Sequence, residues 1–205
     1  MIDTVILILG KVLVEYDWES YSKAVLFWRE DFSSVGRCDF LKWGWILGDQ
    51  GAVTPEEWLQ CFLQNAPHNE KEVRQVFEGL AGCIHKFPYT DRLIAHFREK
   101  GCRIYYLFQL FGRIIWNDKR GTWDLSIALT EVFFLTKNVT KPEEKIYKTL
   151  LTRYNIKPEN AIFFDDRPEN VEAAKMLGNP GCCFYTRSCR RNILDKWEEG
   201  TEWEK

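Results

Sequence analysis

Hydrophobic and polar positions divide most of the chain into short apolar runs and longer amphipathic segments. The short runs are rich in β-branched and aromatic residues, as in strands that are buried on both faces of a sheet. They lie at residues 4–10, 103–108, 161–164 and 182–185, with a weaker candidate at 131–135. The amphipathic segments carry apolar side chains at helical spacing and lie at residues 89–100, 143–154 and 168–177. Strands that alternate with helices of about ten residues predict an α/β fold with a doubly wound parallel sheet.

The stretch between residues 17 and 86 breaks this alternation. It contains no convincing strand, and its helical windows are 20–32, 55–65 and 70–80. We therefore expect a helical cap domain that is inserted after the first strand. The predicted division is a Rossmann-like core domain of residues 1–16 and 87–205 and a cap domain of residues 17–86.

Composition and charge narrow the range of partners. The chain has 28 basic and 30 acidic residues, which argues against nucleic acid as a partner because phosphate binding needs an excess of clustered Lys and Arg. No apolar run reaches the roughly 18 residues of a membrane helix, and the first residues lack the basic region of a signal peptide. We therefore expect no membrane partner and a cytoplasmic location. Seven cysteines without a CxxC pair indicate reduced thiols rather than disulfides or structural zinc.

The strongest candidate chemistry lies where the predicted strands end, because open parallel sheets bind ligands beyond the carboxyl ends of their strands. Asp165 and Asp166 directly follow the apolar run 161–164 and precede a helix that Pro168 opens. Two adjacent carboxylates at such a position are candidate metal ligands. The segment 162–174 resembles the fourth motif of the haloacid dehalogenase-like (HAD-like) hydrolases.

Three further segments resemble the other motifs of this family. From the first motif to the third they are residues 5–17, 104–109 and 141–147. The third motif supplies a lysine, here Lys141, that neutralises the phosphate and the nucleophile. The resemblance covers most of the first 190 residues. It implies a Rossmann-like sheet with a helical cap, and hydrolysis through a nucleophilic aspartate with magnesium.

The sequence departs from the family pattern at the residues that carry this reaction. Ile8 stands where the family has its nucleophilic aspartate, and Phe108 and Gln109 stand where it has Ser/Thr and Asn. Isoleucine cannot form an aspartyl intermediate, and Mg²⁺ loses one carboxylate ligand. We therefore expect no phosphatase or dehalogenase activity and no required cofactor, with Mg²⁺ possible only if Asp165 and Asp166 still bind it.

The departures are mostly apolar or aromatic, and they favour a pocket for a small apolar or aromatic molecule. The candidate lining residues are Ile8, Trp43, Trp45, Phe108 and Phe111. Lys141, and Lys11 next to Gly10, are candidate amines for Schiff-base chemistry with a carbonyl substrate, and Gln109 is a candidate for positioning a water or hydroxyl group. A hydrolase scaffold redesigned for a new ligand would show the same pattern.

Two other functions fit the same residues. The chain is a non-catalytic binding or interaction protein if its aromatic cap holds a ligand or a partner helix. It is a metal-dependent hydrolase of the phosphatase type if Asp165 and Asp166 hold a metal-bound water that replaces the missing aspartate. The sequence alone leaves these alternatives open.

Overall fold

The computed structural model of the 205-residue chain describes residues 2–17, 20, 54–65, 67–79, 83–108, 131–134 and 141–183. Within these residues, five strands form one parallel sheet in the order β5–β4–β1–β6–β7. Their bounds are β1 Thr4–Ile8, β4 Arg103–Phe108, β5 Glu131–Phe134, β6 Ala161–Asp165 and β7 Gly181–Cys183. The α/β fold with a parallel sheet that the sequence predicts is confirmed.

β1 is the central strand of this sheet. It pairs in parallel with β4, where Ile8 lies opposite Leu107, and with β6, where Leu7 lies opposite Phe164. Every residue of β1 and of β6 is buried, as expected for strands that have helices over both faces. This double burial explains why both strands are nearly unbroken apolar runs in the sequence.

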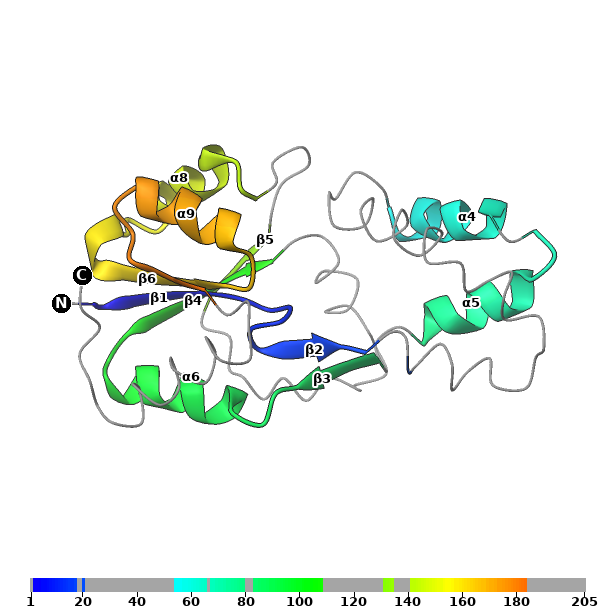
Figure 1. Ribbon diagram of the computed structural model, residues 1–205, viewed down its shortest axis with the longest axis horizontal. Helices are drawn as coiled ribbons and strands as arrows, with labels where there is room; N and C mark the ends of the chain where they lie inside the picture. Colours follow the sequence, from blue (N-terminus) through cyan, green and yellow to red (C-terminus); the bar gives the residue numbers. More distant parts are fainter. Residues whose placement is uncertain are drawn as a thin grey trace.

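Three helices cover the two faces of the sheet (Figure 1). Their bounds are α6 Thr90–Glu99, α8 Glu144–Arg153 and α9 Pro168–Met176, and a short 3-10 turn, η2 Pro158–Asn160, leads into β6. The ring of Phe97 on α6 lies 5.8 Å from that of Phe164, whereas the ring of Tyr147 on α8 lies 5.4 Å from that of Phe163. Neighbouring residues of β6 thus face opposite helical layers. The predicted helices are confirmed, with ends that differ by at most one residue.

A two-stranded antiparallel ribbon continues from β1 (Figure 1). It consists of β2 Val14–Tyr16 and β3 Ile84–Lys86, with Glu15 opposite His85. The expectation that residues 17–86 contain no strand is therefore wrong at β3. A three-residue strand in which His85 and Lys86 follow Ile84 has too few alternations to show the period of a strand.

Two helices lie beyond this ribbon, apart from the sheet (Figure 1). They are α4 Pro55–Asn65 and α5 Glu70–Glu78, and they pack through the rings of Trp58, Phe62 and Phe77. Both coincide with helical windows of the sequence, and the division into core and cap domains stays a prediction. In the part of the chain that the structure describes, the helices are too short or too polar for a transmembrane segment.

Candidate functional site

The candidate site lies at the carboxyl ends of β1 and β6. Because Leu7 pairs with Phe164, the next residues, Ile8 and Asp165, end neighbouring strands side by side. Side chains alternate between the faces of a strand, so Asp165 lies on the same face as Phe163, which contacts α8. Ile8 lies on that face too, because Ile6 and Phe163 both line a small cavity beneath α8 and α9.

Lys141 reaches this face from the turn that precedes α8. Its Nζ atom lies 2.8 Å from Oδ2 of Asp165, and the two side chains are only 7% and 0% exposed. We call the group of Ile8, Lys141, Asp165 and Asp166 the strand-tip site. The structure thus brings together four of the residues that the sequence singles out, three of them polar and one apolar.

Asp165 accepts hydrogen bonds from three donors of its own fold. Oδ2 accepts from Lys141, while Oδ1 accepts from the backbone N–H of Arg167 and from Nδ2 of Asn170, both at 2.9 Å. The Asn170 carbonyl in turn accepts from the hydroxyl of Tyr147 at 3.0 Å. Burial, together with the negative charges of Asp165 and Glu169, raises the pKa of Tyr147, so this hydroxyl stays protonated and remains a donor.

Asn170 and Tyr147 are site residues that sequence reasoning missed. A buried carboxylate needs fixed donors, and Asn170 stands in the first turn of α9, five residues after Asp165. That spacing is the signal that could have found Asn170. Tyr147 has no comparable signal, because its apolar ring already explains its place on the buried face of α8.

Asp166 has a different environment from that of its neighbour. It is partly buried, and burial raises its pKa to about 6, with a further contribution from the negative charge of Asp165. The positive charge of Lys141 acts in the opposite direction. Asp166 is therefore a carboxyl group that changes its charge close to neutral pH.

The described residues supply an incomplete set of ligands for a magnesium ion. Mg²⁺ needs several oxygen ligands in octahedral geometry, but the side chain of Ile8 offers no oxygen and Asp165 already accepts from three donors. In the described parts of the chain, His, Cys, Asp and Glu side chains form no group of three or more that could hold a metal ion. Asp165 and Asp166 alone do not supply the donors of such a site.

Lys11 lies outside the strand-tip site. It sits in the turn between β1 and β2 with a backbone φ of +63°, and its side chain is 46% exposed. Its ammonium forms an ion pair of 3.6 Å with Glu15. Its backbone N–H donates to the carbonyl of Val14 at 2.7 Å. Among the described residues, therefore, Lys11 pairs along the ribbon and not with Lys141 or Asp165.

The remaining candidates of the sequence receive no structural description. Trp43, Trp45, Gln109 and Phe111 lie outside the described residues, as does the side chain of Phe108, whose backbone ends β4. Their roles in a pocket or in positioning a water stay predictions.

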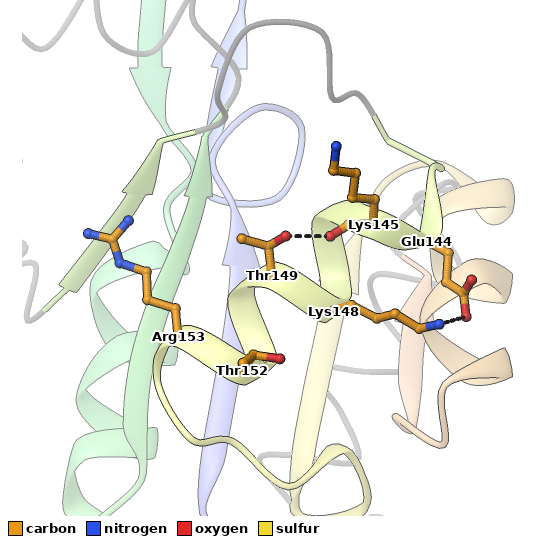
Figure 2. Close-up of a pocket in the computed structure, with 6 residues that line it drawn as sticks. All are labelled: Glu144, Lys145, Lys148, Thr149, Thr152 and Arg153. Carbon is orange, nitrogen blue, oxygen red and sulfur yellow. Dashed lines mark hydrogen bonds and ion pairs between the residues drawn. The ribbon is translucent and has the colours of Figure 1, made fainter.

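A hollow of about 590 Å³ lies over the outer face of α8 (Figure 2). Its described lining residues are Glu144, Lys145, Lys148, Thr149, Thr152 and Arg153. Two of their interactions are local to the helix: Lys148 pairs with Glu144 at 2.8 Å, and the Thr149 hydroxyl donates to the carbonyl of Lys145. Such contacts are typical of a solvated helix face, and this hollow contains none of the residues of the strand-tip site.

Comparisons with known proteins agree with this architecture. A sequence model of the haloacid dehalogenase-like hydrolases matches residues 55–178. Flavin mononucleotide hydrolase 1 of Arabidopsis thaliana is 25% identical over 143 residues, which are 68% of this chain and 56% of that protein. The chain thus spans little more than half the length of this relative.

Two solved structures share the fold. A HAD-like hydrolase from Porphyromonas gingivalis superposes with a TM-score of 0.68 at 19% identity, over 99% of this chain and 100% of that one. A HAD family enzyme from Bacteroides thetaiotaomicron, in complex with magnesium and inorganic phosphate, gives a TM-score of 0.62 at 19% identity, over 89% and 94% of the two chains. The sheet order and the strand-end residues agree with the matched sequence model. The chain belongs to the haloacid dehalogenase-like hydrolase family.

Proposed function

We propose that this member of the family binds a small apolar or aromatic molecule at the strand-tip site and does not hydrolyse phosphate esters. The observation that carries the proposal is the position of Ile8. This side chain is 5% exposed at the end of β1, on the face that holds Lys141 and Asp165. It occupies the place of the nucleophilic aspartate that the family resemblance implies, and an alkyl group cannot attack phosphorus.

Asp165 is a poor substitute for the missing nucleophile. Its two oxygens accept from Lys141, from the Arg167 N–H and from Asn170. An attack on phosphorus would remove an oxygen from these donors, and donors that lose their acceptor in a buried site carry a large free-energy cost. This weighs against covalent hydrolysis at the strand-tip site and also against metal-bound water on Asp165 and Asp166.

Magnesium is not part of this proposal. The Bacteroides neighbour binds it together with phosphate, but the donors that are described here do not make up a magnesium site. Binding of an apolar molecule needs no metal, because the removal of apolar surface from water supplies the driving force.

The proposed ligand is apolar or aromatic because the strand ends offer apolar surface. Ile8 lies in the site, and Trp43, Trp45, Phe108 and Phe111 are the further lining residues that the sequence predicts. By its name, the Arabidopsis relative acts on flavin mononucleotide, a flat aromatic molecule that carries a phosphate. A ligand with a flat aromatic ring, bound without phosphoryl transfer, is consistent with the apolar strand ends and with the flat ring of flavin mononucleotide.

Schiff-base chemistry by Lys141, or by Lys11, stays a prediction. The attacking amine must be neutral, whereas the ammonium of Lys141 is the counter-ion of a fully buried carboxylate. A carbinolamine on Lys141 would leave Asp165 without this partner, which is costly in a buried site. The ion pair therefore weighs against Lys141 as a nucleophile, and borohydride trapping with an aromatic ketone tests it directly.

The experiment combines a binding assay with a turnover assay. In equilibrium dialysis we expect the wild-type protein to bind 2-acetylnaphthalene, and we expect Ile8→Asn to weaken that binding about fivefold through lost apolar contact. With 2-naphthyl phosphate and Mg²⁺, we expect no release of 2-naphthol by the wild-type protein. Ile8→Asp restores the carboxylate of the family, and Ile8→Asn is its matched control of the same size without a nucleophilic oxygen.

Two results would overturn the proposal. The first is magnesium-dependent release of 2-naphthol by the wild-type protein that Asp165→Asn abolishes, since this would establish hydrolysis at the strand-tip site. The second is binding of 2-acetylnaphthalene that is absent or unchanged in Ile8→Asn, since the apolar ligand would then not lie against β1.

A further inference from the structure

The ammonium of Lys141 has more hydrogen-bond donors than the described residues satisfy. A lysine ammonium carries three N–H donors, and the partner of Lys141 in the described part of the chain is Oδ2 of Asp165. The side chain is 7% exposed, so water reaches it poorly. Buried N–H groups need acceptors, and a ligand at this position is one source of them.

The side chain of Ile8 at the end of β1 offers Lys141 no acceptor. In the arrangement that the family resemblance implies, the lysine faces a carboxylate at the end of β1 as well as a phosphate. Here the end of β1 is an alkyl side chain on the same face, and it accepts no hydrogen bond from Lys141. Among the described residues, the N–H donors of Lys141 that Asp165 does not take therefore find no acceptor on the side chain that ends β1.

The charges around the strand-tip site do not favour a dianion. The negative charge of Asp165, whose Oδ2 lies 2.8 Å from Nζ, balances the positive charge of Lys141, and Asp166 adds a further carboxyl group. The guanidinium of Arg167 is paired with Glu169 at 2.6 Å, on exposed side chains. Among the described residues of the site no positive charge is left over to neutralise a phosphate monoester, and the magnesium donor set is incomplete.

We propose that the strand-tip site selects an uncharged aromatic ligand with a carbonyl-type oxygen that accepts a hydrogen bond from Lys141, and that it discriminates against the phosphorylated form of such a ligand. This inference rests on the proposed function, because it assigns the class of molecule that the apolar site takes. It reverses the preference for phosphate esters that the family resemblance implies.

The test uses three probes that share one ring system. 2-Acetylnaphthalene has a neutral acceptor oxygen, naphthalene has none, and 2-naphthyl phosphate carries a dianion. In equilibrium dialysis without divalent cations we expect the ketone to bind about tenfold more tightly than naphthalene, through a hydrogen bond from a charged donor in a buried site. We expect 2-naphthyl phosphate to bind at least about tenfold more weakly than the ketone.

The key variant is the double substitution Lys141→Met with Asp165→Asn. It removes the ammonium and its counter-ion together, so that no buried charge is left unpaired, and Asn keeps an oxygen for the N–H groups of Arg167 and Asn170. We expect this variant to bind the ketone and naphthalene equally. Lys145→Met, which removes an exposed ammonium from α8, should leave the order of the three affinities unchanged.

The outcomes separate the inference from the proposed function. If naphthalene and the ketone bind but 2-naphthyl phosphate binds most tightly, the selectivity is refuted while apolar binding stands. A preference for the ketone that persists in the double variant shows that Lys141 is not its donor, and this too refutes the inference. If no probe binds the wild-type protein, the proposed function fails and the inference fails with it.

Discussion

Lys141 and Asp165 form an ion pair in which Nζ lies 2.8 Å from Oδ2 and both side chains are almost completely buried. The pair connects the turn before α8 to the end of β6. The family resemblance implies that this lysine neutralises a phosphate and a nucleophile. In this structure the carboxylate of Asp165 forms an ion pair with it. The ion pair is therefore part of the structure before any ligand arrives, and its removal should affect stability.

Loss of one partner of this pair should be strongly destabilising. Lys141→Met leaves the carboxylate of Asp165 buried without its counter-ion, and we expect the free energy of unfolding to fall by about 3–5 kcal/mol. The double variant with Asp165→Asn should recover most of that loss. The measurement is urea unfolding followed by circular dichroism.

The exposed pair of Lys148 and Glu144 on α8 provides the matched control, since its N–O distance is also 2.8 Å but both side chains are 59% exposed. Lys148→Met should cost no more than about 0.5 kcal/mol. Equal losses for Lys141→Met and Lys148→Met would contradict the structural importance of the buried pair.

Asp166 should give stability a pH dependence of defined sign. Burial and the charge of Asp165 raise its pKa from 3.8 to about 6, against the attraction of Lys141. Between these values the folded protein holds a proton that the unfolded chain has released. The contribution of this group to stability therefore falls as the pH rises through that window, by about 1–3 kcal/mol in total.

The measurement compares the wild-type protein with Asp166→Asn in urea unfolding at pH 4.5 and pH 7.5. Because asparagine stays neutral, the variant should gain stability relative to the wild-type protein as the pH rises. Glu159→Gln, at an exposed carboxyl group, is the control and should show a smaller change. A constant difference between Asp166→Asn and the wild-type protein at both pH values would argue against the raised pKa.

Much of the sheet could be predicted from the sequence because its central strands are buried on both faces. β1 and β6 read as apolar runs for that reason, and the helices between the strands show their period. β3 could not be found, since three residues give no period and their partner strand, β2, lies about 70 residues away along the chain.

The candidate site was predictable in its members and less so in its contacts. Motif spacing placed Lys141 and Asp165 near each other, but no sequence pattern says that the two form a buried pair or that the Tyr147 hydroxyl donates to the Asn170 carbonyl behind it. Lys11 illustrates the same limit. Its distance along the chain from Ile8 is short, yet the turn directs its side chain to Glu15.

Lys11 should be a site at which glycine increases stability. A left-handed backbone with φ of +63° costs an L-residue about 1–2 kcal/mol, and glycine avoids this cost. Part of the gain is cancelled because glycine loses more conformational entropy on folding. We expect Lys11→Gly to raise the free energy of unfolding by about 1 kcal/mol, because the exposed pair with Glu15 contributes little. Thermal and urea unfolding measure the change.

Asn155, with φ of +49°, is the comparison residue for this prediction. Asparagine tolerates the left-handed region, so Asn155→Gly should gain less than Lys11→Gly. A loss of stability in Lys11→Gly would mean that the lysine side chain stabilises the turn by more than its backbone conformation costs.

Gly10 should resist replacement by alanine for a steric reason. A Cβ atom at this position would lie 2.5 Å from Cε2 of Tyr16, so the tyrosine ring must move. We expect Gly10→Ala to lower the free energy of unfolding by about 1–3 kcal/mol. In a Tyr16→Val background the cost should fall by more than half.

Gly101 separates this effect from backbone strain. It has a φ of +73°, and among the described residues no atom lies within 4 Å of the place that an alanine methyl group would take. The cost of Gly101→Ala therefore comes from the backbone, and it should be the same in the wild-type protein and in the Tyr16→Val background. If Tyr16→Val rescues both alanine variants equally, the contact with the tyrosine ring is not the cause.

Because β1 is the central strand, it cannot pair within the sheet until its later-synthesised neighbours are available. During synthesis β1 leaves the ribosome before the other four strands of its sheet, and its neighbours are residues 103–107 and 161–164. At the usual rate of translation the last partner arrives roughly 10–30 s later. Until then Thr4–Ile8 is an uncharged, β-branched segment of the kind that associates with other nascent chains. Asp3 precedes this strand and Lys11 follows three residues after its end, and charges at such flanking positions oppose the association of apolar strands.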